Sequence, residues 1–84
     1  MVEERRPHIL LVEDEEAHIE LMQRAFEDEG ELVNLMVVRT LQEARGYMSE
    51  STPDLVVVDL LLPDGEGTEL LPPANTEQLF PVVI

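Results

Sequence analysis

Three carboxylic acids stand where apolar stretches of the sequence end. Glu13 and Asp14 directly follow the apolar run 9–12, and Asp59 lies near the carboxyl end of the most apolar run, 55–60. Carboxylates that share a small site repel one another unless a cation offsets their charge. Several hard oxygen ligands suit Mg²⁺, which keeps some waters and accepts a phosphoryl oxygen. The acids therefore predict a Mg²⁺ site in which one carboxylate, best placed at Asp59, attacks phosphorus to give an acyl phosphate.

The elements that must position these acids follow from the apolar pattern. Short apolar runs alternate with amphipathic stretches, which is typical of strand–helix–strand units around a parallel sheet. We predict strands over 9–12, 32–38, 55–60 and 81–84. The first helix carries an apolar stripe of Ile19, Met22 and Phe26 and ends near Gly30. Since the carboxyl ends of parallel strands share one edge, where such sheets bind ligands, Glu13, Asp14 and Asp59 are expected together there.

The second helix has a start signal of its own. Thr40 and Glu43 have the spacing of a capping box, in which each side chain bonds the backbone amide of the other residue. After the third strand, Pro63, Gly65 and Gly67 mark a loop, and 68–71 is long enough for one helical turn. We expect His18, on the acidic first helix, to be a surface residue rather than a metal ligand. His8 lies at a strand entrance and has no ligand-like spacing.

Composition narrows the class of protein. The 84 residues carry 19 acidic and 5 basic side chains, a formal charge of −14, and no cysteine. Such a surface disfavours direct contact with nucleic acid or anionic lipid and favours divalent cations and basic partners. No apolar run approaches the roughly 20 residues that cross a bilayer. We therefore expect a single cytoplasmic domain over 1–84, with 1–6 as a tail.

A purely structural interpretation of the acids stays open at this point. Acidic residues after a strand often only cap the next helix, which would account for Glu13 or Glu15. Asp59 is harder to explain in this way, because a charge among apolar neighbours needs a partner. Backbone amides could be that partner.

Longer stretches of the chain resemble a known family. The response-regulator receiver domain is similar to this sequence in HILLVEDEEAHIELMQRAFEDEG, in PDLVVVDLLLPDGEG and in FPVVI, so the resemblance extends from 7 to 84. It depends on an acidic pair after the first strand, then a strand-end Asp with Pro four residues later and Gly eight later. This resemblance implies a doubly wound, flavodoxin-like α/β sheet with four of the usual five strands.

The resemblance also implies roles for individual residues. Asp59 would be the phosphoacceptor that takes phosphate from a sensor histidine kinase or a phosphotransfer protein. Asp14 would bind Mg²⁺ directly, Glu13 would act through water, and the backbone carbonyl of Leu61 would be a further ligand. The loop around Asp59 would be shaped by Pro63 and Gly67.

Some family features have no counterpart in these residues. Receivers use a Ser or Thr after the fourth strand, an aromatic residue on the fifth strand and a Lys at its end, whereas this sequence holds no lysine. We therefore expect weakened phosphorylation and switching. An exposed fourth-strand edge and first helix further predict a homo-oligomer, most simply a dimer.

Three functions remain to be compared. The first is two-component signalling by a phosphoacceptor that is not an enzyme toward a separate substrate. The second is a non-phosphorylated pseudo-receiver that acts through protein–protein contact. The third, a phosphohydrolase of the haloacid dehalogenase type, needs a second Asp two residues after the nucleophile, and Leu61 occupies that position.

Overall fold

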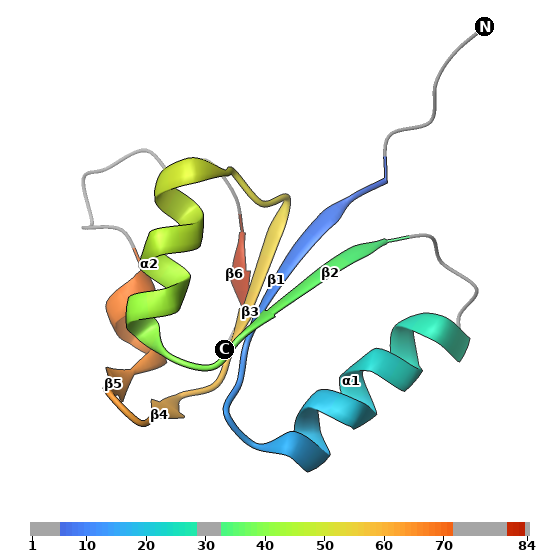
Figure 1. The fold of residues 1–84 in the computed structure, drawn as a ribbon, viewed down its shortest axis with the longest axis horizontal. Coiled ribbons are helices and arrows are strands. Elements are labelled where there is room, and N and C mark those ends of the chain that lie inside the picture. The colour runs from blue at the N-terminus through green and yellow to red at the C-terminus, as the bar shows by residue number, and fades with distance from the viewer. Residues whose placement is uncertain (1–5, 29–32, 72–80, 84) are drawn as a thin grey trace, which may run out of the picture.

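A four-stranded parallel sheet organises the chain, with strand order β2-β1-β3-β6 (Figure 1). The computed structural model describes residues 6–28, 33–71 and 81–83. In chain order the elements are β1 (His8–Val12), α1 (Glu16–Asp28), β2 (Asn34–Val38), α2 (Leu41–Glu50), β3 (Leu55–Val58), β4 (Leu61–Leu62), β5 (Gly65–Glu66), the 3₁₀ turn η1 (Gly67–Leu70) and β6 (Val82–Val83). Among these residues no helix is both long and apolar enough to span a bilayer.

The burial of the inner strand β1 shows that the sheet is covered on both faces. Its last four residues are all buried, as expected for a strand with a helix layer on either side. Figure 1 shows α1 and α2 on opposite sides of the sheet. The predicted doubly wound, flavodoxin-like fold is therefore confirmed.

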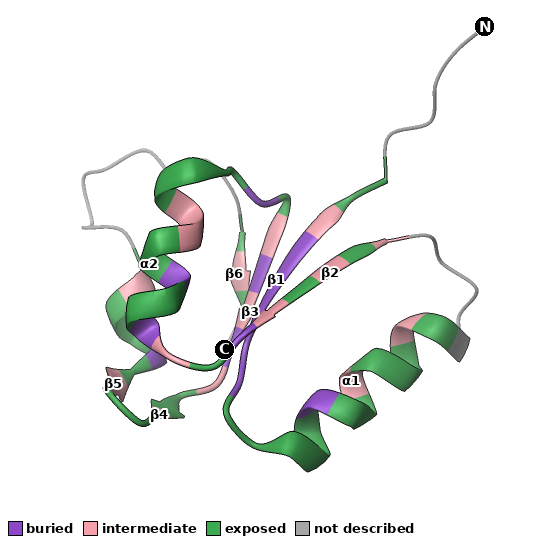
Figure 2. Cartoon of the chain, in the orientation of Figure 1, coloured by how far each residue is buried: buried purple, intermediate pink, exposed green. Residues whose placement is uncertain are grey.

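The core is concentrated between the sheet and α2 (Figure 2). Alternate residues of β1 and β3 point to that side, and Ala44 of α2 packs against them with no exposed surface. On the α1 side, Ile19 is the buried anchor, whereas Leu21, beside the stripe, is 65% exposed. The cluster on the α2 side consists of Leu10, Val12, Val38, Ala44, Val56 and Val58, with Tyr47, Met48, Leu62, Leu70 and Val82 packed around it.

The start of α2 differs in one detail from the predicted capping box. The Thr40 side chain accepts a hydrogen bond from the Glu43 amide at 3.1 Å, as expected for an N-cap residue. The Glu43 carboxylate accepts from the amide of Arg39 rather than from that of Thr40. It also accepts from the Thr40 hydroxyl at 3.3 Å, so the box closes one residue earlier than its spacing indicated.

The strand bounds differ from the predicted runs: β1 begins one residue earlier, at His8, whereas β2 and β3 are shorter. β3 ends at Val58, so Asp59 follows the strand instead of lying within it. A hairpin of β4 and β5, which the sequence pattern did not predict, occupies the start of the expected loop. The expected helical turn is the 3₁₀ turn η1, and β6 lies within the predicted fourth strand. The predictions for Gly30, Leu32 and Ile84 lie outside the described residues, as does the tail except Arg6.

Candidate functional site: an acidic pocket at the carboxyl edge of the sheet

Strand register brings the acids together. Val12, the last residue of β1, lies opposite Val38 of β2 and Val58 of β3, so the three strands end level. The hydrogen-bond ladder continues for one further residue, because the Glu13 amide donates to the Val38 carbonyl at 3.0 Å and the Asp59 amide to the Val12 carbonyl at 2.9 Å. Both acids are thereby fixed at their backbone.

The side chains of the acids complete a possible cation site. Carboxylate oxygens of Glu13, Asp14 and Asp59 all lie within 4.8 Å of one another. Glu13 is the buried member, with 9% of its side chain exposed, Asp59 is half-buried and Asp14 is exposed. The three acids thus present carboxylate oxygens from the buried interior out to solvent, and we call this group the acidic pocket. Oxygen donors in this arrangement fit a hard divalent cation such as Mg²⁺.

His18 joins the edge of this pocket, which the sequence interpretation missed. Its imidazole Nδ1 lies 3.1 Å from Oε1 of Glu13 and 3.4 Å from Oε2 of Glu15. The hydrogen bond to Glu13 and then the charge of Glu15 raise the pKa of His18 above its ordinary value of 6.5. The expected surface position is correct, since 56% of the side chain is exposed. The spacing of five residues from Glu13 to His18 crosses the turn into α1, so no helical periodicity indicated this contact.

The segment after Asp59 folds back on it tightly. The Gly67 amide donates to the Leu60 carbonyl at 2.7 Å, and a Cβ atom at residue 67 would collide with the Asp59 carbonyl oxygen. Gly65 has φ 152°, which side chains rarely permit. Pro63 lies in the turn between β4 and β5, and Leu61 opens β4 opposite Glu66. The role of the Leu61 backbone carbonyl as a metal ligand stays a prediction.

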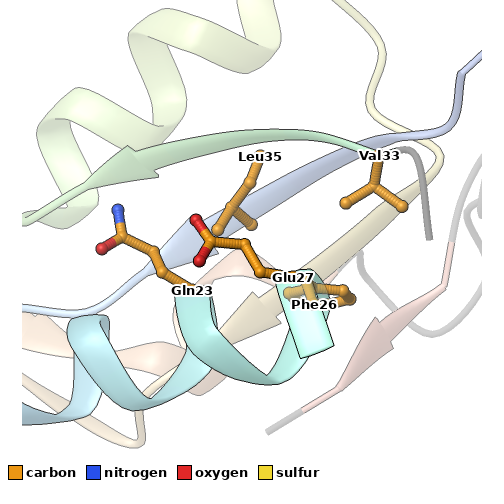
Figure 3. A pocket seen from close by; sticks show the side chains of 5 residues that line it. All are labelled: Gln23, Phe26, Glu27, Val33 and Leu35. Atoms are coloured by element: carbon orange, nitrogen blue, oxygen red, sulfur yellow. The ribbon is translucent and has the colours of Figure 1, made fainter. Parts of the chain in front are cut away.

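A hollow lies in a different part of the molecule, between α1 and the start of β2. It has a volume of about 300 Å³ and is lined by Gln23, Phe26, Glu27, Val33 and Leu35. Figure 3 shows these side chains between α1 and the first part of β2, toward the amino end of that strand. The acids lie at the carboxyl edge, so the hollow does not enlarge their pocket.

A parallel sheet with helices on both faces and three acids at its carboxyl edge defines the architecture of a receiver domain. Comparison with known proteins agrees: the family model of the response regulator receiver domain matches residues 9–84. The chain belongs to this family.

Relatives of known name and structure are similar over most of this chain. The KDP operon transcriptional regulatory protein KdpE of Escherichia coli is 35% identical over 92% of the chain, and the methanogenesis regulatory protein FilR1 of Methanothrix harundinacea is 38% identical over 90%. The chain spans 33% and 18% of the length of these two relatives.

Among solved structures, the MaeR response regulator bound to beryllium trifluoride superposes with a TM-score of 0.77 at 26% identity. That match covers 92% of this chain and 64% of MaeR. The phosphorylated cyanobacterial phytochrome response regulator RcpA gives a TM-score of 0.70 at 35% identity, over 77% of this chain and 51% of RcpA. The receiver fold is therefore established by both sequence and shape.

Proposed function

We propose that this receiver domain acts in a phosphorelay, with Asp59 as the residue that accepts the phosphoryl group. The main observation behind this proposal is that carboxylate oxygens of Glu13, Asp14 and Asp59 lie within 4.8 Å of one another at the carboxyl edge of the sheet. Asp59 suits the nucleophile because its backbone is held by the ladder while its side chain is half-buried and reachable. Glu13 is too enclosed for attack, and its carboxylate already accepts from the Glu15 amide.

The transfer step is a simple exchange of bonds. A carboxylate oxygen of Asp59 forms a bond to phosphorus as the P–N bond of a phosphohistidine breaks. The electron pair of that bond stays on the imidazole nitrogen of the donor. The product is an acyl phosphate on Asp59. The chain is then a phosphoacceptor and not an enzyme toward a separate substrate.

Mg²⁺ is the cofactor that the donor set favours. Glu13 and Asp14, with Asp59 and the Leu61 carbonyl, would hold the ion, and its charge would offset their negative charge as an anionic donor approaches. The fixed backbone at Glu13 and Asp59 keeps these groups aligned without the ion. The solved structure of phosphorylated RcpA supports phosphoryl acceptance by a protein of this fold.

The partner would be a histidine kinase or a phosphotransfer protein in the cytoplasm. The charge of −14 favours a partner with a basic contact surface and disfavours nucleic acid. This negative charge also makes two copies of the chain repel each other. A homodimer through the β6 edge and α1 would form against this repulsion; it stays a prediction, and sedimentation at micromolar concentration checks it.

Acetyl phosphate and Mg²⁺ provide the direct test. Intact-mass measurement should show a gain of about 80 Da, the mass of one phosphoryl group. Asp59→Asn should abolish the gain. The matched control is Asp54→Asn, because Asp54 directly precedes β3 just as Asp59 directly follows it. The control should keep the gain, and chelation of Mg²⁺ should remove it.

A second candidate is a non-phosphorylated interaction module. The observation that favours it is that Glu13 already has partners within the fold, since its carboxylate accepts from the Glu15 amide and lies 3.1 Å from Nδ1 of His18. A folded wild-type protein that gains no mass with acetyl phosphate, and none with a phosphorylated kinase, would favour this candidate and contradict the first.

A further inference from the structure

The first turn of α2 is held by a residue that lies far away in the sequence. The two carboxylate oxygens of Asp64 accept hydrogen bonds from the amides of Leu41 and Gln42, at 2.8 Å and 3.0 Å. These are the first two helical amides, which have no partner within the helix. The next amide, of Glu43, is bonded by the N-cap residue Thr40. A distant carboxylate and a local hydroxyl thus share the cap of α2.

Asp64 belongs to the segment that follows the phosphoacceptor. It lies in the turn of the β4–β5 hairpin, and Leu61 is the first residue of that hairpin. The bonds to α2 therefore reach across from the hairpin that carries the predicted carbonyl ligand. The amides of Leu41, and then of Gln42, hold the pKa of Asp64 below its usual range, which agrees with an ionised carboxylate.

Neighbouring contacts join the same two segments. A Cβ atom at residue 65 would lie only 2.7 Å from Cδ1 of Leu41, so the hairpin and α2 approach closely there. Glu69 of η1 accepts from the Glu66 amide at 2.8 Å and lies 3.6 Å from Arg45 of α2. The second contact is between exposed side chains and adds little. Asp64 is the polar group with two charge-assisted bonds to the backbone of α2.

We propose that Asp64 is a positioning residue for the metal site: it fastens the β4–β5 hairpin to α2 and so holds the Leu61 carbonyl in place. This inference rests on the proposed function, because it assigns Asp64 to the same Mg²⁺ pocket. Two bonds to successive amides fix the orientation of the hairpin as well as its distance from the helix. Groups that orient a ligand in this way change metal affinity without touching the ion.

The test compares wild type with Asp64→Asn and with Thr40→Ala. Asparagine keeps one acceptor oxygen and loses the charge and the second acceptor, so one of the two bonds is lost. Thr40→Ala is the matched control, since it removes a bond from the same helix start without touching the hairpin. Two measurements are needed: amide hydrogen exchange of β4 and β5 without Mg²⁺, and Mg²⁺ affinity by calorimetry.

Asp64→Asn should speed exchange in the hairpin and raise the Mg²⁺ dissociation constant about 10-fold. Thr40→Ala should leave both close to wild type, although it weakens α2. Unchanged hairpin exchange in Asp64→Asn would overturn the proposal, and so would faster exchange with unchanged affinity. Equal effects of the two variants would also overturn it, because they would reflect the stability of α2 alone.

Failure of the proposed function gives a different result. A wild-type chain that binds no Mg²⁺ would contradict the phosphoacceptor pocket. The exchange data from the ion-free protein would then still decide whether Asp64 fastens the hairpin.

Discussion

Two helices begin at the same edge of the sheet, and their starts are built in different ways. The first three amides of α2 donate to the side chains of Asp64 and Thr40, and Leu41 is 1% exposed. Ahead of α1, Glu13 and Asp14 gather with Asp59 instead. At the start of α2, carboxylate oxygens bond the first two helical amides. Ahead of α1, the Glu13 carboxylate bonds the amide of Glu15, which precedes the helix, and lies close to two further acids.

This difference separates structure from function at one edge of the sheet. Carboxylate that accepts bonds from helix amides stabilises the fold. Carboxylates that face one another cost stability until a cation arrives, which is characteristic of binding sites. An acidic residue after a strand can therefore either cap a helix or help to form a binding site, and the contacts of its side chain show which role it has.

Truncating the first residue of each helix gives the largest expected contrast. Leu41→Ala should lower the free energy of unfolding by about 3 kcal/mol, because it leaves a cavity beneath α2. Glu16→Ala, at the first residue of α1, should change it by less than about 0.5 kcal/mol, because 66% of the Glu16 side chain is exposed. Urea unfolding measures both. Similar losses in the two variants would show that the helix starts do not differ as described.

The sequence predicted the fold well because short-range signals carry it. Apolar runs place the four parallel strands, and the Thr40–Glu43 spacing places the start of α2. The β4–β5 hairpin gave no such signal, because its strands have two residues each and apolar residues continue on both sides of Asp59 as far as Leu62. Asp64 was missed for a related reason: its partners lie 23 and 22 residues away.

Removing one carboxylate from the pocket should stabilise the ion-free protein. Asp59→Asn relieves repulsion with Glu13 and Asp14 and should raise the free energy of unfolding by about 1 kcal/mol without Mg²⁺. Mg²⁺ should raise the melting temperature of wild type, since it binds the folded state, and should raise that of the variant less. Thermal unfolding with and without Mg²⁺ measures both effects. Destabilisation of the ion-free variant would mean that Asp59 supports the fold.

The acids of the pocket were predictable, whereas their neighbours were not. Glu13, Asp14 and Asp59 lie just after strands that pair in level register, so strand order and register bring them together. The contact of His18 with Glu13 depends on the path of the chain between β1 and α1, which no periodicity describes. A side-chain contact across a turn is therefore found from the three-dimensional structure and not from the sequence pattern.

The smallest expected effect is a shift in the titration of His18. Its raised pKa means that the pair with Glu13 adds stability below pH 6.5, and this contribution is lost as the pH rises through the folded-state pKa. Glu13→Gln removes the largest cause of the shift, so the pKa of His18 should fall toward its ordinary value. Glu15→Gln should lower it less, because Glu15 acts through charge alone. NMR titration of the imidazole in Mg²⁺-free buffer measures each value. A larger fall in Glu15→Gln would place His18 with the first turn of α1 rather than at the edge of the acidic pocket.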